Sequence, residues 1–285
     1  MTHTDVMTAS EEAKALADGI TKELVDEVKE KRLREAVESE RVKLNGVWRA
    51  MQKDAQRRLR QFPDLADPRI YDMHHKLLLE VANCITLAPQ CRRFVEDEYN
   101  AKLIKFLLYY FNNSQLAEQI YPDKKYKCAK PLLLMGNVGV GKTLLMQIFA
   151  EYLRRIDSPN RFYNVSVTQM VNYYTIHNNL DRFTYNEIDN PGMFDGNPVN
   201  VCLNDIGVDA DEKKRQHFGT NLKTLTEDFL HARNEIWTQY GKKAHLTTNL
   251  TKKELNSLFE DKFGGRLSDR FKAYNIIILD GTSRR

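Results

Sequence analysis

One short segment combines glycines with a lysine and a threonine at a spacing suited to phosphate. Residues 136–143 read Gly-Asn-Val-Gly-Val-Gly-Lys-Thr, which matches the pattern GxxxxGK[ST]. Glycines in such a loop adopt backbone conformations that aim successive N–H groups at phosphate oxygens. Lys142 supplies a positive charge for the β- and γ-phosphates, and the Thr143 hydroxyl can coordinate Mg²⁺. The segment therefore predicts a nucleoside triphosphate site, with ATP and Mg²⁺ as cofactors. The residues expected to contact the nucleotide are Gly136, Asn137, Val138, Gly139, Val140, Gly141, Lys142, Thr143 and Leu144.

The elements on either side of this segment have the character that the motif requires. An apolar run at 132–135 precedes it and predicts a strand, and a helical pattern follows over 143–156. The positive end of that helix adds to the attraction for phosphate.

A P-loop also needs an acidic group at the end of a neighbouring strand to hold the hydrated Mg²⁺. The apolar run 199–205 ends in Asn204 and Asp205, so these two residues, together with Thr143, are the candidate metal ligands. Parallel strands in open α/β sheets bind ligands at their carboxyl ends, which places this pair beside the phosphates. Asp205 is also a candidate catalytic residue.

Two further segments carry polar groups suited to the same edge of the sheet. Asn249 follows another apolar run, where its amide can orient water or touch the γ-phosphate; equally, Asn249 or Thr251 can cap the next helix. Arg266 and Arg270 follow two glycines. Either arginine can be exposed charge or can reach the γ-phosphate of a neighbouring subunit.

These motifs, in this order, resemble the AAA+ ATPases of the DnaC-type helicase-loader family and the related IstB transposition ATPases. The similarity covers roughly residues 130–280 and includes GNVGVGKT, CLNDIGV, TTNL and GGRLSDRF. It implies that the glycine-rich segment is a Walker A motif and that the strand ending in Asn204 and Asp205 carries the Walker B motif.

The same resemblance implies roles for the remaining candidates. Asn249 becomes the sensor I residue, and Arg266, with Arg270 as second choice, becomes an arginine finger acting across a subunit boundary. Proteins of this family often lack the helical lid of other AAA+ proteins, and the short segment after residue 280 leaves no room for one here.

The sequence departs from the family at one position of the Walker B motif. The family usually has Asp-Glu where this chain has Asn204-Asp205. In one reading, the metal-side Asp is replaced by Asn204 and the catalytic Glu by Asp205. In the other, shifted by one residue, Asp205 holds the metal and Ile206 follows where an acid would activate water. Both readings predict ATP binding with slow hydrolysis, because a carboxylate displaced by about 1 Å can cost on the order of a hundredfold in rate.

The two halves of the chain differ in how their apolar residues are spaced. Short apolar runs at 131–135, 161–167, 199–205, 243–248 and 274–280 alternate with helical stretches at 143–156, 221–240 and 252–259. This alternation predicts an α/β fold with a mainly parallel sheet flanked by helices. The first half reads as helix over about 8–61 and again over about 71–111, with a hinge expected between 112 and 130. We therefore expect a helical region over 1–120 and a P-loop ATPase domain over 121–285. In the helicase loaders that the motifs resemble, the N-terminal region binds the replicative helicase, so the resemblance implies that residues 1–120 bind the helicase or another partner.

Composition excludes several other classes of protein. The 285 residues carry 43 Lys+Arg against 39 Asp+Glu, a net charge of +4, and no apolar run approaches the roughly 18 residues of a membrane span. The first ten residues lack a basic-then-apolar stretch, so no secretory signal is expected. Four cysteines without a CxxC pair are typical of reduced thiols, which predicts a cytoplasmic protein.

Three functions remain open at this point. The first is a helicase loader that assembles with ATP as a homo-oligomer and delivers a replicative ring helicase to single-stranded DNA. The second is an IstB-like ATPase assembling on duplex DNA, and the third is a nucleotide-gated scaffold with negligible turnover. Aromatic residues over 173–185 and the basic cluster 213–215 are candidate DNA contacts, against the plainer interpretations of sheet packing and a solvated loop.

Overall fold

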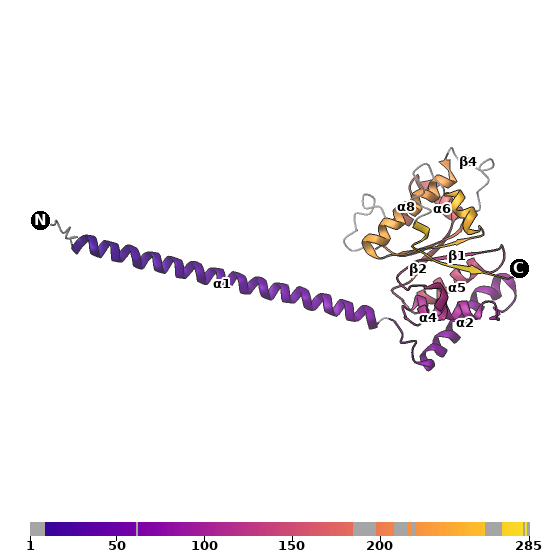
Figure 1. Ribbon diagram of the computed structural model, residues 1–285, viewed down its shortest axis with the longest axis horizontal. Helices are drawn as coiled ribbons and strands as arrows, with labels where there is room; N and C mark the ends of the chain where they lie inside the picture. Colours follow the sequence, from indigo (N-terminus) through magenta and orange to yellow (C-terminus); the bar gives the residue numbers. More distant parts are fainter. Residues whose placement is uncertain are drawn as a thin grey trace. The chain divides into compact units, whose positions relative to one another are not determined.

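The computed structural model describes residues 9–60, 62–184, 198–207, 216–217, 220–259, 270–281 and 283. It divides into two compact units, one ending at Arg60 and one beginning at Gln61. The described part of the first unit is one helix, α1 (Ala9–Arg60), of 52 residues, drawn in indigo in Figure 1. At 1.5 Å per residue it is about 78 Å long.

α1 has no core of its own. Every α1 side chain whose exposure is described is exposed, including the large apolar residues Leu16, Ile20, Leu24, Val28 and Trp48. The predicted helix over about 8–61 is confirmed for the described residues.

The second unit is built on a five-stranded parallel sheet. Its strand order is β2-β3-β6-β1-β7. The strands are β1 (Leu132–Gly136), β2 (Phe162–Ser166), β3 (Asn200–Ile206), β6 (Ala244–Thr248) and β7 (Asn275–Leu279). Two residue pairs, β4 (Gln216–His217) and β5 (Thr220–Asn221), form a separate antiparallel ladder.

Helices cover both faces of this sheet (Figure 1). Leu132 and Leu134 of β1 join one apolar cluster, with side chains of α2 (Pro68–Gln90), α3 (Ala101–Phe111) and α5 (Lys142–Arg155). Leu133 and Met135 join the other, with α6 (Val167–His177), α8 (Leu222–Tyr240) and α9 (Lys252–Leu258). Burial on both faces explains the uninterrupted apolar sequence of β1, and the predicted P-loop α/β fold class is confirmed. Among the described residues, the short helices are α4 (Ala117–Ile120), η1 (Pro122–Lys124) and α7 (Asp181–Thr184).

Local capping explains where several helices begin. Asp67 accepts a hydrogen bond from the Arg69 N–H and Pro68 occupies the first turn of α2. α6 starts with a capping box between Ser166 and Gln169. The predicted helical block over 71–111 is two helices, because α2 ends in a left-handed residue at Cys91 and α3 begins only at Ala101.

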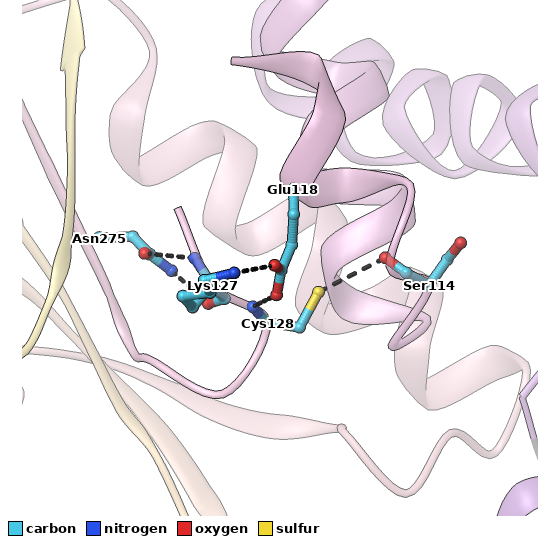
Figure 2. A network of polar contacts seen from close by, with 5 residues as sticks. All are labelled: Ser114, Glu118, Lys127, Cys128 and Asn275. Carbon is cyan, nitrogen blue, oxygen red and sulfur yellow. Dashed lines mark hydrogen bonds and ion pairs between the residues drawn. The ribbon is translucent and has the colours of Figure 1, made fainter. Parts of the chain in front are cut away.

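The boundary expected near residue 120 differs from the one that the structure has. The chain divides at Arg60, since α2 and α3 bury Leu78, Leu107 and Phe111 in the same cluster as β1 and α5. The segment expected to be a hinge, 112–130, is also held firmly. The Lys127 N–H donates to Asn275 Oδ1 at 2.9 Å, and the Asn275 amide donates back to Lys127 O at 2.7 Å. Both contacts are drawn as dashed lines in Figure 2.

The same network continues into α4. The Cys128 N–H donates to Glu118 Oε1 at 3.1 Å, and the Cys128 thiol contacts Ser114 O at 3.4 Å (Figure 2). The Lys127 ammonium pairs with Glu118 and lowers the pKa of that carboxyl. Residues 112–130 therefore connect α3 to the sheet through polar contacts on both sides.

All four cysteines are unpaired thiols. Among the helices that the structure describes, none is both long enough and apolar enough to cross a membrane.

Candidate nucleotide-binding site

The glycine loop, as we call residues 136–143, joins the carboxyl end of β1 to the start of α5. Gly139 and Gly141 have φ angles of 87° and 98°, in the region that favours glycine. Gly141 is also the N-cap of α5 and has no side chain to occupy the first free N–H groups of the helix. The loop therefore presents backbone donors at the helix N-terminus, as an anion site requires.

Gly136 must be glycine for a packing reason as well. Its φ is 151°, and a Cβ at this position would lie 2.4 Å from the backbone oxygen of Leu279 in the neighbouring strand β7. Ser283 also lies close to the loop, because a Cβ at Gly139 would be 2.2 Å from the Ser283 Oγ. Both glycines allow close approach of another part of the chain.

Lys142 connects the glycine loop to the end of β6. Its side chain is buried, and Nζ donates to Gly136 O at 2.7 Å and to Asn137 O at 2.8 Å. It also donates to Asn249 Oδ1 at 2.7 Å. The ammonium group thus lies inside the loop, where it can act on an anion that the loop holds.

The contact with Lys142 decides between the two interpretations of Asn249. α9 is capped by Thr251, whose side chain forms a capping box with Glu254. Asn249 is therefore not the cap, and its side chain joins the candidate site at the carboxyl end of β6.

Asp205 comes near Thr143 through an irregularity in β3. The pairing of β3 with β6 shifts register between Leu203 and Ile206, and Asp205 has a left-handed φ of 61°. A β-bulge of this kind redirects a side chain. The Asp205 Oδ1 lies 3.5 Å from the Thr143 Oγ1.

The Asn204 side chain, in contrast, is directed toward the neighbouring strand β2. It is 2% exposed, and its Nδ2 donates to Asn164 Oδ1 at 2.6 Å and to Val165 O at 3.2 Å, both on β2. Of the two residues expected to hold the metal, the structure brings only Asp205 to Thr143. Burial and the nearby Asp205 carboxylate raise the pKa of the Cys202 thiol, which lies two residues before Asn204 on β3.

The groups that the structure collects fit ATP and Mg²⁺. A hydroxyl and a carboxylate oxygen are the hard donors that Mg²⁺ prefers, and Thr143 and Asp205 supply them. The Lys142 ammonium and the donors of the glycine loop match a phosphate chain. The remaining predicted contacts differ in exposure: Val138 is exposed, Val140 is buried and Leu144 is packed against the core.

The two candidate arginines have different outcomes. Arg266 lies outside the described residues, so its role stays a prediction. Arg270 contacts the His231 ring on α8, within its own unit.

Two residues of the site region were missed by the sequence analysis. Asn164 and Thr247 both contact Asn204, and their only sequence signal was a polar residue within an apolar strand pattern. Of the aromatic candidates, Tyr173 packs on Phe183 with ring centroids 5.1 Å apart, which agrees with the packing interpretation. Tyr185 and the basic cluster 213–215 lie outside the described residues.

Comparison with known protein families and with curated proteins gives no match. Solved structures do match. Domain III of the replication initiation protein DnaA from Thermotoga maritima shares 18% identity over 66% of this chain and 65% of its own, with a TM-score of 0.41. AMPPCP-bound DnaA from Aquifex aeolicus shares 17% over 66% of this chain and 48% of its own, with a TM-score of 0.40.

A third structure, the DnaC helicase loader, shares 15% identity over 67% of this chain and 95% of its own, with a TM-score of 0.40. This loader is of the family that the sequence motifs resemble. The chain spans 65% and 48% of the two DnaA structures, and likeness at these identities concerns the fold.

Proposed function

We propose that this chain is an ATP-binding AAA+ protein of DNA replication that loads a replicative ring helicase onto single-stranded DNA. The observation that carries the nucleotide-binding part is the position of Lys142. Its buried ammonium joins the glycine loop to Asn249, next to the Thr143–Asp205 pair. The DNA-replication part rests on the ordered motifs and on their resemblance to helicase loaders.

Each residue of the site has a defined task in this proposal. The N–H groups of the glycine loop and the Lys142 ammonium hold the phosphates, while Thr143 and Asp205 hold Mg²⁺. Asn249 orients the γ-phosphate end. Bound ATP with Mg²⁺ would supply the phosphoanhydride bond whose hydrolysis resets the protein.

Hydrolysis is proposed to be slow. The Asn204 amide cannot accept a proton as a carboxylate does, and it is engaged with β2. Asp205 points to Thr143, and Ile206 follows it. These features also favour a second candidate, a nucleotide-gated scaffold with negligible turnover. Phosphate release that rises with single-stranded DNA and helicase would support the loader and contradict the scaffold.

The proposed partners are assigned to different parts of the chain. The exposed apolar residues of α1 are the proposed contact with the helicase. The sheet unit would assemble with ATP into a homo-oligomer on single-stranded DNA, with Arg266 reaching the γ-phosphate of the next subunit. A cytoplasmic location is part of the same proposal.

Nucleotide binding is tested with a fluorescent ATP analogue, mant-ATP, titrated against the full chain. Lys142→Met keeps the aliphatic stem and removes the charge, so binding should weaken by roughly 10- to 100-fold. Lys124→Ala removes an exposed lysine of η1 and should leave the affinity unchanged. Equal affinity of Lys142→Met and the wild type would show that the glycine loop is not the nucleotide site.

Helicase binding is tested by co-purification of the full chain with a replicative helicase. The double variant Leu24→Asp/Val28→Asp places charge on one apolar stripe of α1 and should lose the complex. Lys22→Ala, at an exposed position on the opposite side of the helix by helical periodicity, is the matched control. Retention of the complex by the double variant would contradict the role given to α1.

A further inference from the structure

A row of three polar side chains crosses the sheet below the end of β3. Hydrogen bonds link Asn164 on β2 to Asn204 on β3, and Asn204 to Thr247 on β6. The Asn204 Nδ2 donates to Asn164 Oδ1 at 2.6 Å, and the Thr247 hydroxyl donates to Asn204 Oδ1 at 3.3 Å. Asn204 is 2% exposed and Thr247 is fully buried. Burying a polar group costs free energy unless it is hydrogen-bonded, so each of these side chains depends on the hydrogen bonds that its neighbours supply.

This row reaches the backbone of Asp205. The Asp205 N–H donates to the Thr247 Oγ1 at 2.9 Å. The contact lies inside the register shift between β3 and β6, where Asp205 has its left-handed φ of 61°. Left-handed conformations cost energy in residues other than glycine, although Asp and Asn adopt them more readily than most residues do. Here the Thr247 hydroxyl, oriented by Asn204, supplies a side-chain acceptor for the N–H that the bulge would leave without a regular strand partner.

The position of Asn204 requires an amide rather than a carboxylate. Its Nδ2 donates two hydrogen bonds, to Asn164 Oδ1 and Val165 O. An ionised Asp at 204 can only accept, so it would face the Val165 oxygen without a proton to share. The departure from the Asp-Glu pattern is therefore matched by the surroundings of Asn204.

We propose that Asn204 and Thr247 are positioning residues that hold the β3 bulge and thereby turn the Asp205 carboxylate toward Thr143. Asn204 is not a metal ligand in this arrangement; the metal-binding carboxylate is one residue further along β3, at Asp205. Restoring an acid at position 204 would therefore weaken the site instead of repairing it. This inference rests on the proposed binding of ATP with Mg²⁺.

The test uses the full chain and two readouts. The first is hydrogen exchange of the Asp205 amide in the nucleotide-free protein. The second is the magnesium gain, defined as the ratio of the mant-ATP Kd in EDTA to the Kd in Mg²⁺. Thr247→Val removes the hydroxyl, Thr247→Ser keeps it, and Asp205→Asn gives the magnesium gain expected without the carboxylate.

Thr247→Val should accelerate exchange of the Asp205 amide by roughly tenfold, the loss of about one hydrogen bond. Its magnesium gain should fall to that of Asp205→Asn, whereas Thr247→Ser should match the wild type in both readouts. Asn204→Asp should melt at a lower temperature, with no increase in magnesium gain or in ATP turnover.

Several results would overturn the proposal. A rise in magnesium gain or turnover in Asn204→Asp would place position 204 at the metal. A full magnesium gain in Thr247→Val, or a wild type that binds mant-ATP equally well in EDTA, would remove the positioning role while leaving nucleotide binding intact. A wild type that binds no mant-ATP at all would instead end the proposed function, and this inference with it.

Discussion

The glycine loop and the end of β3 face each other across the candidate site, yet they are built in different ways. Both follow a buried parallel strand and both contain left-handed residues. In the glycine loop those residues are Gly139 and Gly141, whereas at the end of β3 the left-handed residue before Gly207 is Asp205. The loop obtains its shape from residues that accept it freely. The strand end obtains its shape from side chains on neighbouring strands.

The difference shows two ways of making a binding group available. Where the backbone N–H groups do the binding, glycine alone suffices and the motif is compact in sequence. Where a side chain must be aimed, the supporting residues come from β2 and β6, about 40 positions away along the chain in each direction. Substitutions that separate conformational freedom from packing can therefore test this comparison.

The largest effect is expected at Gly136. Gly136→Ala would place a Cβ 2.4 Å from the Leu279 backbone oxygen, which cannot move without disturbing the β1–β7 pairing. We expect a loss of about 2–4 kcal/mol in the free energy of unfolding, measured by urea denaturation, together with loss of mant-ATP binding. Gly281→Ala is the matched control, because Gly281 has a similar φ of 138° but open space around it. Equal losses in the two variants would show that the close approach to β7 is unimportant.

An intermediate effect is expected at Gly207, just after the β3 bulge. A Cβ there would lie 2.3 Å from Cδ1 of Leu250 and 3.2 Å from Cδ2 of Leu258. Because both atoms end flexible side chains, Gly207→Ala should cost about 1–3 kcal/mol in unfolding free energy. Gly241→Ala has a comparable φ of 67° and no neighbour within 4 Å, so it isolates the cost of the backbone conformation. If Gly207→Ala is no worse than Gly241→Ala, packing against Leu250 and Leu258 does not constrain the strand end.

The smallest effect on stability is expected at Asp205 itself. Asp205→Gly relieves the left-handed φ, so the variant should be at least as stable as the wild type and about 1 kcal/mol more stable than Asp205→Ala. Both variants should lose the magnesium gain in mant-ATP affinity. A glycine variant that is clearly less stable than the alanine variant would mean that the backbone at 205 is not held in the left-handed region.

Much of this protein could be predicted from short stretches of sequence. The parallel α/β sheet follows from alternating apolar runs and helical patterns, and the glycine loop from eight consecutive residues between a strand and a helix. These features are local, because the glycines that a loop conformation needs and the apolar run of a strand buried on both faces each lie within a few consecutive residues.

Other features depended on contacts between distant residues. The sequence alone allowed Asn249 to cap a helix or to join the site, and it allowed Asn204 or Asp205 to hold the metal. Strand register decides which side chains come together: the β3–β6 shift places Asp205 near Thr143, and the end of β6 brings Asn249 to Lys142. The boundary at Arg60 has the same origin, because only folding reveals that the helices over 68–111 share a core with the sheet.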